Sequence, residues 1–246
     1  MPRSAMLAIG DELLSGRTKD ANLHHLAGVL TEAGAPLAEA RVVSDDHGAI
    51  VGALNALRAA HDYVFTSGGI GPTHDDITAD AVGAAFGVAV DVREDARAIL
   101  ERHYGDAAKL TEARLRMARI PEGAALIENP VSGAPGFRIG NVFVMAGVPA
   151  IFRAMVASVL PEIEGGPPVR SRSFRAMVPE GDLAGPLARL AEEMPDVSFG
   201  SYPFHTPAGF GARIVARSPD AARLDAAAAA VAAMFAAMGA EAPEEV

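Results

Sequence analysis

The sequence contains no cysteine among its 246 residues. Without thiols the chain can form neither a disulfide bond nor a thiolate metal site, and no cysteine nucleophile can act in catalysis. A chain of this length can bury a full hydrophobic core without such cross-links. The absence of thiols suits a reducing compartment, and we therefore expect a cytoplasmic location.

Long apolar runs and an excess of positive charge are also missing. The longest apolar tract, 226–238, is rich in alanine and too short to span a bilayer, and Asp11 and Glu12 soon interrupt the first apolar run, unlike a signal peptide. The 31 acidic and 21 basic residues give a formal net charge of −10, whereas general nucleic-acid binding requires dense positive charge. We expect no membrane and no nucleic-acid partner. A small anion can still be bound by backbone N–H groups or a metal ion.

Short β-type runs alternate with helical patterns through the first two thirds of the chain. This alternation predicts right-handed crossovers and a mostly parallel sheet covered by helices on both faces, which is a three-layer α/β/α fold. Strands are predicted at 5–10, 37–43 and 62–67, helices at 20–34, 46–61, 76–87, 93–105, 111–120 and 149–163, and a hairpin that turns at Gly140-Asn141 within 136–147.

A second, smaller domain is predicted after the stretch 164–173, which has the Gly, Pro and Ser content of a linker. The order of elements then changes to strand, helix, strand, strand and helix, which is typical of a small α+β domain. We therefore expect a larger domain at 1–165 and a smaller one at 174–246.

The stretch TSGGIGPTHDD, residues 66–76, is the most informative in the sequence. Gly68, Gly69 and Gly71 lack Cβ atoms, so the backbone can adopt positive φ values and approach a ligand closely. Successive N–H groups in such a turn, followed by a helix N-terminus, can hold an anion. The glycine spacing matches neither the nucleotide-triphosphate P-loop nor the dinucleotide fingerprint. A plain strand-to-helix turn is the alternative, although it needs fewer glycines.

Two aspartates, Asp75 and Asp76, follow this glycine loop at the predicted start of a helix. Carboxylates are favoured there by the helix dipole, and Thr73 with Asp76 fits a capping box, so one aspartate could be structural. A phosphate beside two carboxylates requires a bridging cation, and a hard divalent ion with oxygen ligands is the natural choice.

Further acidic pairs follow two other strands of the predicted sheet. Asp11 and Glu12 come after the first strand, and Asp45 and Asp46 come after the second. Each pair alone could be a solvated helix start. Because ligands bind beyond the carboxyl ends of parallel strands, the loops after the first, third and last strands of the sheet, including AGVP at 146–149, are predicted to share one pocket.

Histidine and serine candidates are weaker. The side chains of His24, His25, His74 and His205 could act as ligands or as acid–base groups, but lone histidines are more often structural. Ser67 lacks the flanking pattern of a hydrolase nucleophile, and we interpret it as a hydrogen-bond donor.

Taken together, the motifs GDELLSG…DAN, VVSDD, SGGIGPTHDDIT and AGVP resemble the molybdopterin-binding fold shared by molybdenum-cofactor biosynthesis proteins. Within that superfamily the chain looks most like the amino-terminal part of competence/damage-inducible protein A (CinA). The segments GGIGPTHDDIT and LTEARLRMARIPEGA are also similar to the molybdopterin-binding-like domain of eukaryotic FAD synthase. The resemblance covers about 5–165, and the small domain more loosely.

This resemblance implies a divalent ion (Mg²⁺, Mn²⁺ or Co²⁺) and a homo-oligomer, either a dimer or a trimer. It implies that Asp45 and Asp76 are catalytic carboxylates linked to the metal, and the position of Asp75 beside Asp76 makes it a further candidate metal ligand. The residues implied to bind phosphate or pterin are Ser67, Gly68, Gly69, Gly71, Thr73, Gly10, Asp11, Glu12, Gly147 and Pro149.

Three activities follow from the resemblance as expectations. CinA-type and FAD-synthase-type members are associated with metal-dependent cleavage of a nucleotide pyrophosphate such as ADP-ribose or FAD, which releases AMP. The first expectation is therefore a divalent-metal-dependent nucleotide pyrophosphate hydrolase. The second is a module that binds molybdopterin or a nucleotide without chemistry, and the third is adenylyl transfer to molybdopterin.

The sequence departs from the family pattern in three places. AGVP replaces the usual PGPP or PGNP, so Ala146 and Val148 alter one wall of the expected pocket. His74 stands where many CinA proteins have lysine, which removes a fixed positive charge near the phosphates. Because the sequence ends at Val246, we expect the amidohydrolase domain that many CinA proteins carry to be missing.

Overall fold

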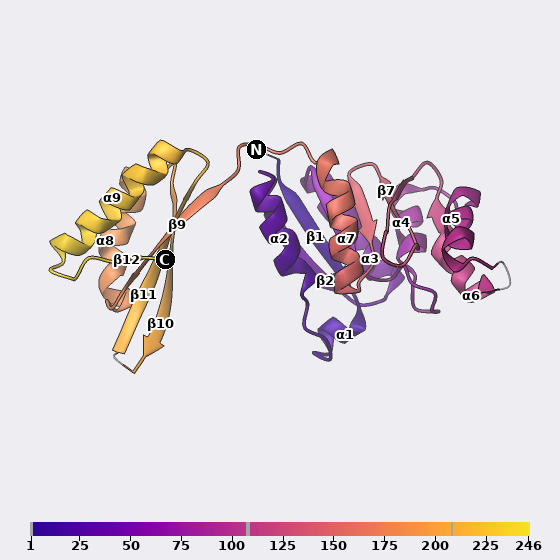
Figure 1. The fold of residues 1–246 in the computed structure, drawn as a ribbon, viewed down its shortest axis with the longest axis horizontal. Helices are drawn as coiled ribbons and strands as arrows, with labels where there is room; N and C mark the ends of the chain where they lie inside the picture. The colour runs from indigo at the N-terminus through magenta and orange to yellow at the C-terminus, as the bar shows by residue number, and fades with distance from the viewer. Residues whose placement is uncertain (1, 107–108, 208) are drawn as a thin grey trace. The chain divides into compact units, whose positions relative to one another are not determined.

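A computed structural model describes residues 2–106, 109–207 and 209–246, which are shown in Figure 1. The chain divides into two compact units, Met1–Gly166 and Pro167–Val246.

The first unit is built on a six-stranded sheet with the strand order β2-β1-β3-β8-β7-β6. The first four of these strands are parallel, and β7 and β6 are joined by antiparallel pairing, so the predicted mostly parallel sheet is confirmed. The central strand β1 is buried along its whole length, which explains its apolar sequence SAMLAI. The strands are β1 (Ser4–Ile9), β2 (Leu37–Val43), β3 (Tyr63–Ser67), β6 (Ala125–Ile127), β7 (Gly136–Ile139) and β8 (Val142–Met145).

Helices cover both faces of this sheet, as predicted, and each face has its own hydrophobic core (Figure 1). On one face α2 (Asn22–Glu32) and α7 (Pro149–Val159) pack over buried side chains that include those of Phe65 and Phe143. On the other face α3 (His47–Ala60), α4 (Thr78–Phe86) and α5 (Glu94–Tyr104) contribute to a core with the apolar side chains of β1.

The strand order places a switch point beside β1. The chain runs from β1 to β2 on one side and then crosses to β3 on the other, so β1 lies between them. A crevice forms at the carboxyl ends of strands where the order reverses in this way. The loops that follow β1 and β3 border this crevice, and they carry the acidic and glycine-rich motifs.

Two predicted helix starts are displaced in the structure. The helix expected from Asp76 begins at Thr78 with Ile77 as its N-cap, so Thr73 and Asp76 lie in the loop before it. The Asp76 carboxylate accepts the Thr73 N–H as in a capping box, but no helix begins there. The helix expected from Asp20 begins at Asn22, and the Asp20 carboxylate accepts hydrogen bonds from the backbone N–H groups of its first two residues. A further short helix, α1 (Asp11–Leu14), stands where a loop was expected.

The helix predicted at 111–120 is correct only at its start. The chain forms α6 (Glu112–Leu115) and the 3₁₀ turn η2 (Arg116–Ala118), and then the strand β5 (Arg119–Pro121), which pairs with the unpredicted strand β4 (Val90–Val92). Pro121 disfavours a helical backbone at the residue before it, and pairing with β4 supplies the alternative hydrogen bonds. The helix predicted at 149–163 likewise ends as α7 at Val159, followed by the 3₁₀ turn η3 (Leu160–Glu162).

The second unit is an antiparallel sheet with the strand order β10-β11-β9-β12 and two helices, so the α+β prediction is confirmed. The core lies between the sheet and α8 (Glu180–Glu193) with α9 (Ala221–Ala237), and the Asp220 carboxylate caps α9. The strands are β9 (Arg170–Ala176), β10 (Ser198–Thr206), β11 (Gly209–Ser218) and β12 (Glu244–Glu245), so β9 begins inside the stretch expected to be a linker.

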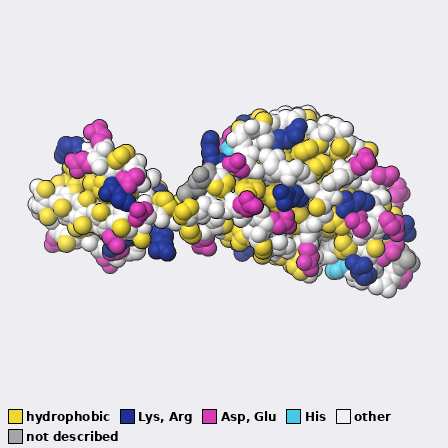
Figure 2. Space-filling view, turned by 90° about the horizontal axis from the view of Figure 1, so that it is seen from above, with side chains coloured by type: hydrophobic (Ala, Val, Ile, Leu, Met, Phe, Trp, Pro, Cys, Tyr) yellow, Lys and Arg dark blue, Asp and Glu magenta, His cyan; other side chains and the backbone are white. Residues whose placement is uncertain are grey.

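The described parts of the chain contain no helix with the length and apolarity required to cross a bilayer. Among the described residues on the face that Figure 2 shows, Lys and Arg side chains are scattered among Asp and Glu and form no continuous basic surface.

Candidate functional site

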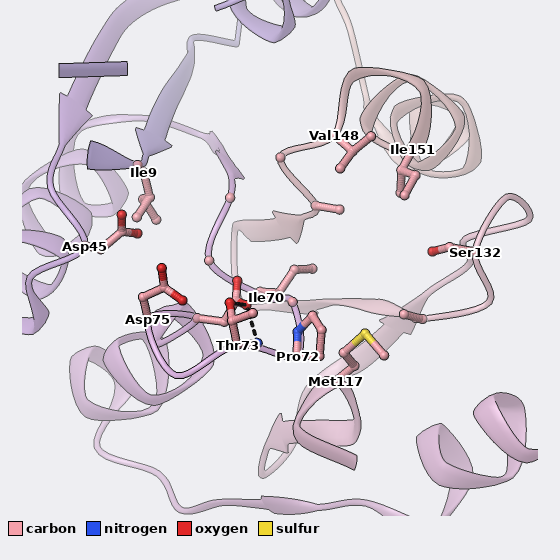
Figure 3. Close-up of a pocket in the computed structure, with 18 of the residues that line it drawn as sticks. Ile9, Asp45, Ile70, Pro72, Thr73, Asp75, Met117, Ser132, Val148 and Ile151 are labelled. Atoms are coloured by element: carbon pink, nitrogen blue, oxygen red, sulfur yellow. Dashed lines mark hydrogen bonds between the residues drawn. The ribbon is translucent and has the colours of Figure 1, made fainter. Parts of the chain in front are cut away.

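A cavity of about 550 Å³ lies beyond the carboxyl ends of the parallel strands of the first unit (Figure 3). Its walls come from the loops after β1, β2, β3 and β8, together with residues near η2 and from the 129–134 loop. The strand-end loops that the sequence predicts to share a pocket therefore do meet in one place.

Most of the residues proposed from the sequence line this cavity, although two do not. Ser67 is buried below it, and Asp11 lies outside its lining. The proposed residues that line it are Gly10, Glu12, Asp45, Gly68, Gly69, Gly71, Thr73, Asp75, Asp76, Gly147 and Pro149.

The two ends of the cavity differ in chemistry. Figure 3 shows Asp45 and Asp75 together on one side, whereas Met117, Val148 and Ile151 lie on the other. The cavity therefore combines an acidic end, which includes Glu12, Asp45 and Asp75, with an apolar end. Such a pocket suits a ligand with a charged part and a flat apolar part.

The glycine loop contributes free backbone donors to this cavity. Within the described residues, the N–H groups of Gly69, Ile70 and Gly71 have no hydrogen-bond partner, whereas the N–H of Gly68 donates to the Met145 carbonyl at 3.1 Å. Consecutive unpaired N–H groups beside a cavity are the donors that an anion requires.

The glycines themselves are needed for packing within the protein. A Cβ on Gly68, whose φ is +110°, would collide with the backbone carbonyl of Ile9, and a Cβ on Gly69 would collide with the Thr78 hydroxyl. Glycine at these positions lets the loop lie directly against β1 and the start of α4. Close packing of the backbone is therefore sufficient to explain why Gly68 and Gly69 are glycines.

Asp76 holds the far end of the glycine loop. Its Oδ2 atom accepts hydrogen bonds from the backbone N–H of Thr73 at 2.8 Å and from the Thr73 hydroxyl at 2.6 Å. A Cβ on Gly71 would approach the same oxygen to 2.6 Å. The other carboxylate oxygen, Oδ1, makes no hydrogen bond within the described residues. Asp76 therefore shapes the loop and retains one oxygen for a ligand or metal ion.

Asp45 and Asp46, adjacent in sequence, have different surroundings. Asp45 lines the cavity, and its Oδ2 accepts a hydrogen bond from the backbone N–H of Asp11 at 2.9 Å. Asp46 lies outside the cavity lining and caps α3 by accepting a hydrogen bond from the N–H of Ala49 at 2.8 Å. Of this pair, only Asp45 is available to a ligand.

The pKa values of two acidic groups move in opposite directions. Burial raises the pKa of Asp45, the hydrogen bond from the Asp11 N–H partly offsets the rise, and the carboxylates of Asp11, Glu12 and Asp75 add to it. The Thr73 side chain lowers the pKa of Asp75. Several carboxylates thus lie close enough to repel one another, and a bound cation would relieve this repulsion.

Replacement of Asp45 by asparagine is expected to stabilise the metal-free protein. A carboxylate with a raised folded-state pKa costs stability above that pKa, and the cost disappears as the pH falls through the raised pKa toward its value in the unfolded chain. The melting temperature of Asp45→Asn in EDTA should exceed that of the unsubstituted protein by about 1–2 °C at pH 7, and the two should converge in mild acid. Thermal melts from pH 7 to pH 4 measure this, and an equal gap at every pH would contradict it.

The described residues contain no group of three or more His, Asp or Glu side chains placed to hold a metal ion. A Mg²⁺-type ion is usually held by one or two carboxylates, by substrate phosphate oxygens and by water. The acidic end therefore contains no preformed three-ligand metal site among the described residues, and an ion held there would need oxygens from a ligand and from water as well as one or two carboxylates.

The N-terminus of α7 also borders the cavity. Val148 is its N-cap, Pro149 is its first residue, and no side chain caps its free N–H groups. The altered AGVP motif thus places Val148, which is 57% exposed, in the apolar wall. An 11-residue helix pointing its uncapped end toward the cavity adds partial positive charge to a site whose lining has no Lys or Arg among the described residues.

Several residues of the site were not identified from the sequence. Asn22 lies behind the cavity, where its side-chain NH₂ donates to Ser67 Oγ at 2.8 Å and to the Gly147 carbonyl at 2.7 Å. Its only sequence signal is the DAN motif at 20–22. Met117 and Ser132 line the apolar side. Met117 lies within the segment LTEARLRMARIPEGA, but nothing in that segment marks it as a site residue.

No histidine among the described residues lines the cavity. The side chain of His74 is 99% exposed, with its Nδ1 3.9 Å from a carboxylate oxygen of Asp75, and the cavity lining includes none of His24, His25 or His74. His205 belongs to the second unit, where its ring contacts that of Phe210. These positions are consistent with the expectation that the four histidines are weaker candidates for ligands or acid–base groups.

Comparison with known proteins defines the class of this fold and site. Residues 5–165 match the family described as "Probable molybdopterin binding domain", and residues 168–243 match the family described as "FAD synthase, middle domain". The chain therefore belongs to the family of probable molybdopterin-binding domains, followed by a unit related to the middle domain of FAD synthase.

Within this family the chain is a CinA-like member. It is 43% identical over 169 residues to a CinA-like protein of Citrifermentans bemidjiense, a match that covers 66% of this chain and 41% of the relative. The chain thus spans about two fifths of that relative's length. A protein of Pyrococcus furiosus is 34% identical over 220 residues, which cover 84% of this chain and 85% of that protein.

A solved structure gives the same assignment. The crystal structure of the protein CinA from Thermoplasma acidophilum, described as having unknown function, superposes with a TM-score of 0.62 at 34% identity. The superposition covers 65% of this chain and 97% of that one. The predicted family is thereby confirmed.

Proposed function

We propose that the first unit is a divalent-metal-dependent hydrolase that cleaves the pyrophosphate of a nucleotide such as ADP-ribose or FAD and releases AMP. The observation that carries the proposal is the division of one cavity into an acidic end beside free backbone N–H groups and an apolar end. A nucleotide has the matching parts, with phosphates at one end and a flat base at the other.

The geometry supports a role for each part of the cavity. The N–H groups of 69–71 would hold phosphate oxygens, while Asp76, with Asp45 or Asp75, would hold a cation against those oxygens. The base would lie against Met117, Val148 and Ile151, which form the apolar end. Phosphoryl transfer requires little of a protein beyond such positioning and charge neutralisation.

The proposed reaction is a displacement at the phosphorus of the adenylate group. A water oxygen attacks this phosphorus, the bond to the bridging oxygen breaks, and the products are AMP and a second phosphate monoester. The divalent ion, when bound, polarises the phosphoryl oxygens and lowers the pKa of water. The backbone N–H groups of the glycine loop hold the phosphate oxygens through this change without a shift of the loop.

Turnover assays test the proposal directly. The purified protein is incubated with ADP-ribose or FAD and Mg²⁺, Mn²⁺ or Co²⁺, and AMP is measured by chromatography. AMP release that requires the metal and is abolished by EDTA is expected. Absence of AMP from both substrates with all three ions would overturn the hydrolase proposal.

Binding without chemistry is the second candidate, with molybdopterin or AMP as the ligand. It is favoured by the absence of a preformed three-ligand metal group and of Lys or Arg from the cavity lining in the described residues. Titration calorimetry distinguishes it, because a carrier binds molybdopterin or AMP stoichiometrically and leaves ADP-ribose intact. Adenylyl transfer to molybdopterin would appear instead as rescue of a strain that lacks the molybdenum cofactor.

A further inference from the structure

The glycine loop also lines a second, much smaller cavity of the first unit, with a volume of about 10 Å³. The residues common to the main cavity and this small cavity are Gly69, Ile70, Gly71, Asp76 and Met117. The small cavity adds two arginines, Arg116 and Arg119, neither of which lines the main cavity. A volume of this size holds about one water molecule, so it is too small for a nucleotide. These arginines therefore act on a ligand of the main cavity only across the glycine loop.

The two arginines differ in how their charges are neutralised. Arg119 forms a bidentate ion pair with the Asp80 carboxylate, with N–O distances of 2.7 and 2.6 Å. Arg116 is half-buried, its Nε atom is buried without a hydrogen-bond partner, and no carboxylate of the described residues forms an ion pair with it. A cation that is partly withdrawn from water without a counter-charge is unfavourable. An anion bound nearby would supply that counter-charge.

The guanidinium of Arg116 is held against the far end of the glycine loop. Its Nη2 atom donates a hydrogen bond to the backbone carbonyl of Asp76 at 3.1 Å. The start of the loop is held as well, because the Thr78 N–H donates to the Gly69 carbonyl at 2.9 Å. The free N–H groups of 69–71 therefore belong to a segment that is fixed at both ends, with an unneutralised cation attached to one of them.

The charge of Arg116 is felt in the main cavity without direct contact. The hydrogen bond from the Thr73 side chain is the main cause of the lowered pKa of Asp75, and the charges of His74 and Arg116 act in the same direction. Asp75 lines the main cavity, whereas Arg116 does not. A fixed charge thus contributes positive potential to a cavity whose described lining includes no Lys or Arg.

We infer that Arg116 is a positioning residue that holds the glycine loop and supplies, from the small cavity, positive charge for an anionic group bound by the N–H groups of 69–71. This inference rests on the proposed nucleotide ligand. A preorganised charge in a poorly solvated site attracts an anion without further rearrangement of the protein. The uncharged base and ribose of the ligand gain nothing from it, so the effect is confined to the phosphate.

Calorimetric titration of the full chain with AMP and with adenosine, each with Mg²⁺, tests the inference. Arg116→Gln removes the charge and keeps an NH₂ group that can donate to the Asp76 carbonyl. The affinity for AMP should fall about tenfold, and that for adenosine by less than about twofold, because only AMP carries a phosphate. A role of Arg116 in the fold alone would weaken both ligands equally, and that result would overturn the inference.

Arg116→Lys tests the role of the charge independently of adenosine. Lysine restores a positive charge without the guanidinium fork, so the affinity for AMP should return to within about threefold of that of the unsubstituted protein. A lysine variant that binds AMP as weakly as Arg116→Gln would show that the charge is not the cause, and the inference would be overturned. Melting temperatures of both variants identify any loss of folded protein.

Arg114→Gln is the matched control. Arg114 lines neither cavity, and its guanidinium donates to the Lys109 carbonyl at 2.6 Å and lies over the Tyr104 ring. The affinity of this variant for AMP should stay within about twofold, since an exposed charge contributes little. An equal loss in Arg114→Gln and Arg116→Gln would overturn the inference alone. If the unsubstituted protein binds neither AMP nor ADP-ribose, the proposed nucleotide function is overturned with it.

Discussion

Asp45→Asn should reduce the rate of AMP release by at least about 100-fold, because it removes one of the few carboxylates that can hold a divalent ion at the acidic end. The substitution preserves size, and its amide oxygen can still accept the hydrogen bond from the Asp11 N–H. Since Asp45→Asn is expected to stabilise the metal-free fold, unfolding cannot explain the loss. Initial rates at saturating Mn²⁺ measure the effect. Asp76 is a less selective target because it also fixes the backbone of Thr73.

Asp46→Asn is the matched control for this prediction. It removes the same charge one residue away, and asparagine caps a helix about as well as aspartate, so α3 should remain intact. Its AMP release should stay within about twofold of the unsubstituted protein, since a surface charge of this kind contributes little. Equal losses in both variants would show that general charge, rather than the position of Asp45, sets the rate.

Gly68→Ala should destabilise the first unit by about 3 kcal/mol, because the backbone conformation strongly favours glycine and the added Cβ meets the Ile9 carbonyl. For a unit of this size the melting temperature should fall by about 6–12 °C. Neither β1 nor β3 can move aside easily, since both are central strands with partners on each side. Calorimetric unfolding measures the loss.

Gly28→Ala makes the same chemical change as Gly68→Ala but is expected to stabilise the protein. Gly28 lies within α2, where an added Cβ meets nothing within 4 Å. Alanine should therefore stabilise this helix by about 0.5–1 kcal/mol. A Gly68→Ala protein that melts like Gly28→Ala would show that the loop can relax away from β1, and the explanation of the glycine loop by backbone packing would then be wrong.

Much of the sheet of the first unit was predictable because its signals are local and strong. The apolar run of β1 and the Gly140-Asn141 turn of the β7–β8 hairpin are each readable within a few residues. The short strands β4 and β5 were not, because three-residue segments such as Val90–Val92 carry too little pattern. Their structure depends on pairing with each other across about 30 residues of chain.

The candidate site was predictable to the extent that topology brings strand ends together. The positions of Asp45, Asp75 and the glycine loop in one cavity follow from parallel strands and their order. The resemblance singled out Asp45, but residue type alone did not separate it from Asp46, and only the start of α3 shows that Asp46 is a helix cap. Asn22 and Met117 lie within the DAN and LTEARLRMARIPEGA segments, but their residue types alone do not distinguish them from ordinary core residues.

By itself the sequence determined the longer strands and helices, the acidic and glycine-rich loops, and the membership of the chain in its family. These features depend on spacing and residue type over short distances, which remain visible in the unfolded chain. The tertiary structure alone decided which oxygens and N–H groups are left without partners, including Oδ1 of Asn22 and the N–H groups of 69–71. Hydrogen-bond partners lie far apart in sequence, so a free donor or acceptor exists only once the chain has folded.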